Sequence, residues 1–130
     1  MDDEKEGKRI KDLLNVMEQE RGKLPGQWKY LAEYDIGYLE AYNRLYNVVF
    51  SDGKALSAKM KELIVIPLLA FRGREDAVYE HCKKALKLGA TRQEILEAIE
   101  VSVIPGGAPT VKIALKSLMQ IDEEEKSGKG

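Results

Sequence analysis

The sequence contains 130 residues, of which 44% are hydrophobic, 33% charged and 7% aromatic, and its formal net charge is -1. This length fits one domain with a hydrophobic core, and the hydrophobic fraction excludes an intrinsically disordered protein. The near balance of 21 basic and 22 acidic residues argues against a nucleic-acid partner, because nucleic-acid-binding proteins carry a basic excess or a basic stripe.

The first half of the chain predicts two helical regions. Within residues 5–20, apolar side chains recur at the i, i+3, i+4, i+7 spacing of one helical face, and Gly22 follows as a helix terminator. The second region covers residues 27–50, where Gly37, next to Asp35, is a point at which the helix could break.

Tyrosines recur every four residues along this second region. They are Tyr30, Tyr34, Tyr38, Tyr42 and Tyr46. Four residues turn a helix by about 400°, so the row drifts gradually around the axis. Two interpretations of this row stay open: the tyrosines pack within the subunit, or they form an interface between subunits.

The next two predicted helices form a hairpin. Ser57 is a candidate N-cap for a helix that ends near Arg72, and Gly73 is its candidate C-cap. The following helix has Glu75 in its first turn and closes at Gly89. We expect the two helices to pack antiparallel at the centre of the fold.

Two helices complete the prediction. Thr91 and Glu94 form a capping box at the start of a helix that extends to about residue 103. Residues 105–109 break the chain, and a last helix then extends to about residue 121. The sequence therefore predicts an all-α, single-domain bundle of about six helices over residues 1–130. We expect fraying at residues 1–5 and 123–130.

Cysteine content and hydropathy suggest the compartment. Cys82 is the single cysteine, so no intrachain disulfide can form, and the N-terminus has no apolar run typical of a signal peptide. The longest apolar stretch, residues 63–71, is too short to span a bilayer. We expect a cytoplasmic protein with no membrane association.

The predicted hairpin suggests an acid–base pair. Glu62 lies about ten residues before the Gly73 turn, and His81, the single histidine, lies about eight residues after it. In an antiparallel hairpin the two side chains come to the same height and can face each other. Glu62 begins an apolar run that should desolvate it, which favours proton transfer.

Each of these candidate functional residues also has a purely structural interpretation. A lone histidine is more often structural, and a glutamate near a helix start is usually a surface charge. We interpret Cys82 first as a small, buried apolar residue and second as a redox-active thiol. We expect no metal site, because one histidine and one cysteine cannot supply a zinc ligand set. Gly106 and Gly107 precede a helix that could bind an anion or simply make a tight turn.

These motifs together resemble the carboxymuconolactone decarboxylase and alkylhydroperoxidase D-like family. The resemblance rests on Glu62, His81 nineteen residues later, the Ala-Leu-Lys-Leu-Gly-Ala-Thr run at 85–91 and the Gly-Gly-Ala-Pro run at 106–109. It covers about residues 56–118. It implies an alkylhydroperoxidase D-like helical fold with its site at the hairpin, and self-association as a homotrimer or homohexamer.

The resemblance also divides the functional options. The peroxidase branch carries Cys-x-x-Cys seven and four residues before the histidine, where this chain has Arg74 and Ala77. The sequence is therefore more similar to the decarboxylase-like branch, which implies cofactor-free acid–base chemistry on a small carboxylated substrate. In that reading His81 transfers the proton, Glu62 orients it and Arg74 binds the substrate carboxylate.

Further elements of this reading, and its alternatives, remain open. In this interpretation the Gly106–Pro109 turn, which contains Gly106 and Gly107, would close the substrate pocket. One alternative is a peroxidase that uses Cys82 alone with an external thiol, and another is a helical oligomer that has lost its chemistry. The sequence does not identify the substrate.

Overall fold

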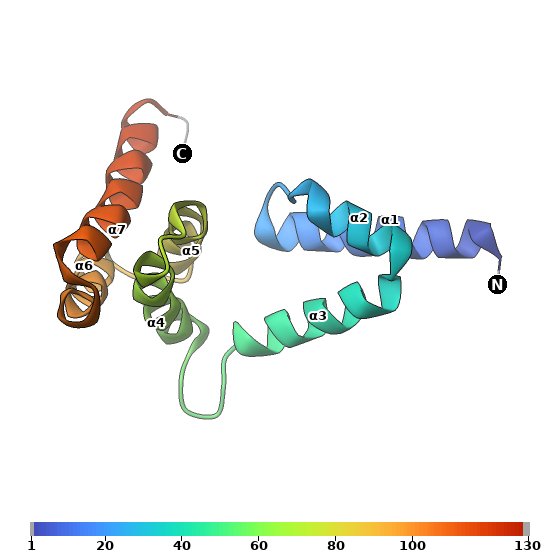
Figure 1. Cartoon of the computed structure of the whole chain (residues 1–130), viewed down its shortest axis with the longest axis horizontal. Coiled ribbons are helices and arrows are strands. Elements are labelled where there is room, and N and C mark those ends of the chain that lie inside the picture. The colour runs from blue at the N-terminus through green and yellow to red at the C-terminus, as the bar shows by residue number, and fades with distance from the viewer. Residues whose placement is uncertain (1, 129–130) are drawn as a thin grey trace. The chain divides into compact units, whose positions relative to one another are not determined.

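The computed structural model describes residues 2–128, and every regular element within them is a helix (Figure 1), as the sequence predicts. The chain divides into two compact units, Met1–Val49 and Phe50–Gly130. None of the helices formed by the described residues is long and apolar enough to cross a membrane.

The first unit contains three helices that pack on one another. They are α1 (Asp3–Arg21), α2 (Gly26–Tyr34) and α3 (Ile36–Val49). The Asp2 carboxylate accepts a hydrogen bond from the Glu4 backbone N–H at 3.0 Å and so caps α1. Apolar faces of the three helices meet in a small core that buries Met17, Ala32, Ile36 and Leu39.

The region 27–50, for which the sequence predicts either one or two helices, is divided at Asp35 rather than at Gly37. Its backbone leaves the helical conformation at φ -156° and ψ 73°, and its carboxylate accepts from the Tyr38 N–H at 3.2 Å. The side chain therefore caps the start of α3, and Gly37 lies inside that helix. This division explains why residues 2–128 form seven helices where about six were expected.

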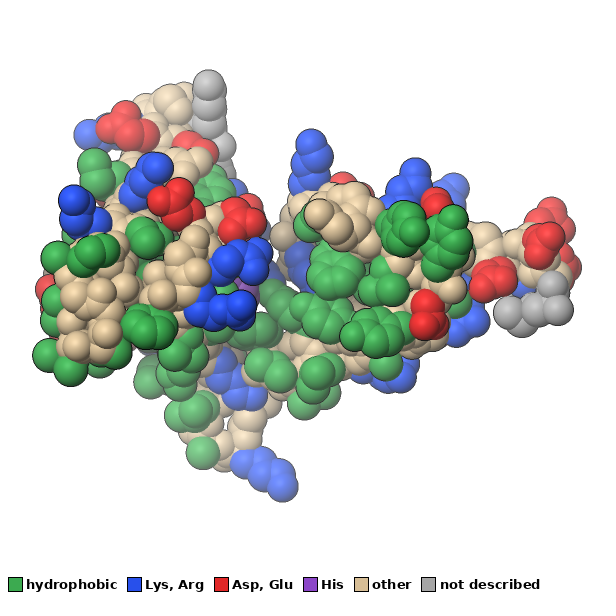
Figure 2. Space-filling view, in the orientation of Figure 1, with side chains coloured by type: hydrophobic (Ala, Val, Ile, Leu, Met, Phe, Trp, Pro, Cys, Tyr) green, Lys and Arg blue, Asp and Glu red, His purple; other side chains and the backbone are tan. Residues whose placement is uncertain are grey.

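The tyrosine row is split between the two helices, and its members differ in how far they are buried. Tyr42 packs within the unit, with its ring centroid 4.9 Å from that of Trp28. Tyr30, Tyr34 and Tyr38 are exposed. In Figure 2, hydrophobic side chains gather over α2 and α3.

The second unit contains the hairpin and the larger core. Its helices are α4 (Ala58–Phe71), α5 (Glu75–Lys87), α6 (Arg92–Val101) and α7 (Val103–Lys126). Helix α4 packs against the other three, because its apolar residues face them in turn. The most deeply buried side chains of this core include Ile66, Val78, Cys82, Ile95 and Ile99.

Local hydrogen bonds fix the helix starts that the sequence predicts. The Ser57 hydroxyl accepts from the Met60 N–H at 3.1 Å at the start of α4. Thr91 and Glu94 form the reciprocal capping box of α6. Gly73 turns the chain between α4 and α5 at φ +74°, a conformation that glycine adopts without steric cost.

The structure departs from the sequence-based expectation at the C-terminal half and at both ends. Helix α7 continues through residues 105–109, where a complete break was expected, and bends at Gly107 with φ 72° and ψ -177°. Helical structure begins at Asp3 and continues to Lys126, so residues 3–5 and 123–126 are helical rather than frayed. An Asp2 cap explains the ordered N-terminal start.

Candidate functional site

The centre of the candidate site is a buried carboxylate–imidazole pair. Glu62 on α4 and His81 on α5 approach with 2.5 Å between Oε1 and Nδ1. The Glu62 residue is 1% exposed, and the His81 side chain is 12% exposed. The pairing that the hairpin geometry predicts is therefore present, with the carboxylate inside and the imidazole reaching toward the surface.

The arrangement follows from how the two helices bury their faces. Glu62 lies on the same side of α4 as Ile66 and Ala70, because residues four and eight apart share a helical face. The Gly73 turn then brings α5 back along α4, which sets His81 at the height of Glu62. A buried carboxylate is costly without a partner, and the imidazole supplies that partner.

The hydrogen bond also selects a tautomer. When Glu62 is ionised, the short contact requires the proton to reside on His81 Nδ1, which donates to the carboxylate. Nε2 is then the basic nitrogen of the ring and carries its lone pair. If Nε2 takes up a proton, Glu62 stabilises the resulting imidazolium ion.

Cys82, the candidate redox residue, lies in the core. Its side chain is fully buried, as the simple packing reading predicts. Burial, together with the nearby negative charge of Glu62, raises the pKa of the Cys82 thiol to about 12. The native environment therefore keeps the sulfur protonated and out of solvent.

The other predicted binding residues do not reach the pair. Arg74 is exposed at the N-cap of α5, with Nε 3.7 Å from an Asp76 carboxylate oxygen, and it precedes His81 by about 10 Å along the helix. Gly106 packs against Phe71, nine residues and about 13 Å beyond Glu62 along α4. These groups therefore gather at the opposite end of the hairpin.

Gly107 belongs to this opposite end by chain connectivity. Its positive φ makes the bend of α7 next to Gly106. An added Cβ at Gly106 would overlap the Thr110 side chain, so the glycine is required for packing. The arrangement favours the tight-turn reading of these two glycines.

Two residues that sequence reasoning missed lie beside His81. The Phe50 ring centroid is 5.1 Å from that of His81, with 38° between the ring planes. Lys84 places its Nζ 5.9 Å from the Phe50 centroid. The spacing of Lys84, three residues after His81, was a usable signal for a shared helical face. Phe50 precedes a loop, so only tertiary structure reveals its position.

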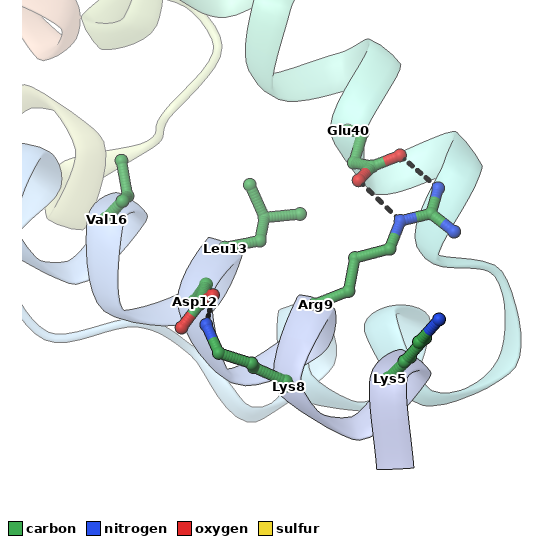
Figure 3. A pocket seen from close by; sticks show the side chains of 7 residues that line it. All are labelled: Lys5, Lys8, Arg9, Asp12, Leu13, Val16 and Glu40. Atoms are coloured by element: carbon green, nitrogen blue, oxygen red, sulfur yellow. Dashed lines mark hydrogen bonds and ion pairs between the residues drawn. The ribbon is translucent and has the colours of Figure 1, made fainter. Parts of the chain in front are cut away.

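A separate cavity lies in the first unit. It has a volume of about 500 Å³ and is formed by α1 with one residue of α3 (Figure 3). Its charged groups are largely paired, since Arg9 binds Glu40 and Lys8 Nζ lies 2.8 Å from Asp12. Within residues 2–128, no three His, Cys, Asp or Glu side chains converge in a metal-binding group.

Comparisons with known proteins give a consistent family assignment. A sequence model of the carboxymuconolactone decarboxylase family matches residues 37–119. An uncharacterised protein of Methanocaldococcus jannaschii is 34% identical over 84 residues, which are 65% of this chain and 78% of that protein. An uncharacterised protein of Cupriavidus necator is 30% identical over 96 residues, which are 74% of this chain and 84% of that protein.

Solved structures agree with the sequence comparisons. A candidate carboxymuconolactone decarboxylase from Burkholderia xenovorans aligns with a TM-score of 0.74 at 27% identity, covering 96% of this chain and 98% of the other. A carboxymuconolactone decarboxylase family protein from Legionella pneumophila aligns with a TM-score of 0.66 at 26% identity, covering 92% and 96% of the two chains.

Proposed function

This chain belongs to the carboxymuconolactone decarboxylase family, and we propose that it performs cofactor-independent proton transfer or decarboxylation on a small carboxylated substrate. The observation that carries the proposal is the 2.5 Å contact between buried Glu62 and His81. A histidine held by a buried carboxylate, with its edge at the surface, is suited to general acid–base catalysis.

The proposed proton movements balance within the pair. His81 Nε2 accepts a proton from a carbon next to the substrate carbonyl, and Glu62 stabilises the imidazolium ion that results. The same nitrogen then returns the proton to the substrate. In a decarboxylation, His81 starts as the imidazolium ion. The electron pair of the broken carbon–carboxylate bond passes into the conjugated carbonyl, His81 Nε2–H then protonates the carbon that lost carbon dioxide, and the neutral imidazole regains its proton from solvent.

The environment of Cys82 supports this reading over a one-cysteine peroxidase. Peroxide reduction requires a thiolate that solvent can reach. Cys82 is fully buried, and its pKa is raised to about 12. The acid–base pair, in contrast, has one edge at the surface.

The test is a reaction screen with matched variants. Small lactone carboxylates are incubated with the protein in D₂O, and NMR follows deuterium incorporation while a second assay measures released carbon dioxide. We expect His81→Asn to abolish the reaction and Glu62→Gln to lower kcat by about 10² to 10⁴-fold. Glu97→Gln, at an exposed site on α6, is the control and should retain full activity.

Circular dichroism of each variant separates a chemical effect from unfolding. Turnover that survives unchanged in folded His81→Asn would refute the acid–base role. If the wild-type protein neither exchanges protons nor releases carbon dioxide from any lactone carboxylate, the helical assembly reading replaces this one.

We also propose that the protein self-associates as a homotrimer or homohexamer, with residues 1–130 acting as one domain. The support is a stripe of apolar side chains on α4, each between 41% and 59% exposed. The stripe consists of Met60, Ile64, Leu68 and Phe71. The family match also includes residues from both compact units.

Light scattering tests the assembly. We expect three or six times the chain mass of 14.6 kDa. Ile64→Glu, in the middle of the stripe, should shift the mass toward the monomer, whereas Gln120→Glu at an exposed position on α7 should leave it unchanged. A wild-type monomer at micromolar concentration would contradict the proposal.

A further inference from the structure

The cavity of the first unit has cationic groups at one end and apolar side chains at the other (Figure 3). Its volume of about 500 Å³ lies within the range of small-molecule sites in proteins. All of its lining residues belong to α1 except Glu40 of α3. The whole cavity therefore lies in the unit Met1–Val49, and neither Glu62 nor His81 contributes to it.

The α1 side chains that line the cavity follow one face of the helix. They include Lys5, Arg9, Leu13 and Val16. Spacings of four, four and three residues keep these side chains in line along the helix axis. Figure 3 shows them in this order, with the two cationic groups at one end. Seven residues separate Arg9 from Val16, so the apolar half of the face extends about 10 Å beyond the guanidinium-bearing residue.

Arg9 keeps part of its donor capacity after pairing with Glu40. Its Nε donates to Glu40 Oε2 at 2.8 Å, and its Nη2 donates to Oε1. This bidentate geometry holds the guanidinium in place and leaves the protons of Nη1 for another acceptor. In Figure 3 the third guanidinium nitrogen has no dashed line and lies on the side nearer to Lys5.

Lys5 supplies the charge that the cavity does not balance. Each of the two lining carboxylates pairs with one of the other two lining cations, and Lys5 has no ion-pair partner among residues 2–128. Lys5 precedes Arg9 by four residues, so the two cationic side chains are neighbours on the helical surface. Both can therefore donate to one anion.

Other charges near this face do not cancel the charge of Lys5. Glu4 and Glu6 are rotated by about 100° from Lys5 around the helix, and neither lines the cavity. Glu6 acts electrostatically on Arg9, and Arg44 acts with the opposite sign on Glu40. These two contributions oppose each other, so the cavity stays complementary to an anion.

We propose that this cavity binds a medium-chain aliphatic carboxylate, such as a free fatty acid of about eight carbons. Its two carboxylate oxygens accept hydrogen bonds from Lys5 Nζ and Arg9 Nη1. Its tail lies over Leu13, which is half-buried, and Val16, which is 46% exposed, and so removes their apolar surface from water. This ligand site is independent of the proposed acid–base function.

NMR of backbone amides tests the proposal by titrating octanoate into the full chain. We expect saturable shifts concentrated on residues 5–16 of α1 and at Glu40. Acetate has the charge without the tail, and 1-octanol has the tail without the charge. Each should bind at least about threefold more weakly than octanoate, because it makes only one of the two kinds of contact.

Matched variants separate the charge from the apolar surface. Lys5→Gln should weaken octanoate binding by about threefold or more and leave 1-octanol binding unchanged, whereas Lys5→Arg should retain octanoate binding. Val16→Ser should weaken the binding of both ligands. Lys11→Gln removes an exposed lysine of α1 that does not line the cavity, and it should leave octanoate binding unchanged. Circular dichroism verifies that each variant is folded.

Several results would overturn the proposal. They are octanoate binding that is equally tight in folded Lys5→Gln, equal affinity for octanoate and 1-octanol, and shifts that fall on α4 instead of α1. Absence of saturable shifts would also overturn it, and a lower mass of Val16→Glu in light scattering would then assign the cavity to a contact between copies of the chain. The acid–base function is judged separately, by the His81→Asn reaction screen.

Discussion

Unfolding the protein should release a reactivity of the Cys82 thiol that the native fold suppresses. Burial, with a smaller contribution from the Glu62 charge, raises the pKa of this thiol from 9.0 to about 12. Only the thiolate is nucleophilic, so a three-unit rise lowers its fraction at neutral pH by about a thousandfold. The full burial of the side chain adds a steric barrier to the same reaction.

Stopped-flow labelling with a chromogenic disulfide at pH 7 measures this difference directly. The rate for the native protein is divided by the rate for the same protein in concentrated guanidinium chloride, and Cys82→Ser supplies the background. We expect the native thiol to react at least about a thousandfold more slowly. A native rate within tenfold of the unfolded rate would show that the thiol is accessible, and it would return the one-cysteine peroxidase to consideration.

Further predictions concern stability and are checked by urea or thermal unfolding monitored by circular dichroism. The raised pKa of Cys82 means that the folded state favours the protonated thiol. Its contribution to the free energy of unfolding is therefore complete below about pH 9 and is lost as the pH rises through about 12. Cys82→Ala should reduce this loss of stability at alkaline pH. Ile66→Ala, in the core, should cost about 2–5 kcal/mol, whereas Met119→Ala, at a 66% exposed site on α7, should cost less than about 1 kcal/mol. Thr91→Ala should cost about 1 kcal/mol because it removes the capping box, and a Tm unchanged within error would contradict that role. Gly106→Ala should cost about 1–3 kcal/mol because the new Cβ overlaps the side chain one turn later, and equal stability would show that α7 relaxes freely.

The elements that the sequence predicts best are those fixed by neighbouring residues. Ser57 and Thr91 cap their helices as expected, because a hydroxyl needs only the backbone N–H three residues later. Gly73 turns the chain because glycine tolerates a positive φ. These interactions span a few residues, so their outcome depends little on the rest of the fold.

The Glu62–His81 pairing is an intermediate case. Its height along the hairpin follows from counting residues on either side of Gly73, which requires only the rise of an α-helix and antiparallel packing. Whether the two side chains face each other depends on the rotation of each helix about its axis. The contact at 2.5 Å exists because the core residues of α4 and α5 fix those rotations.

Tertiary structure alone decided which residues surround the pair. The chain order places Arg74 near His81, but seven residues along a helix separate them by about 10 Å, and the Asp76 carboxylate lies beside the guanidinium. Phe50 lies across a loop from α4, where no periodic pattern connects it with the imidazole, yet the fold brings the two rings to 5.1 Å. Local hydrogen bonds and helical rise can therefore be predicted from the sequence. Helix rotation and loop closure depend on the packing of the whole core, which determines which face of α5 is buried and where Phe50 lies.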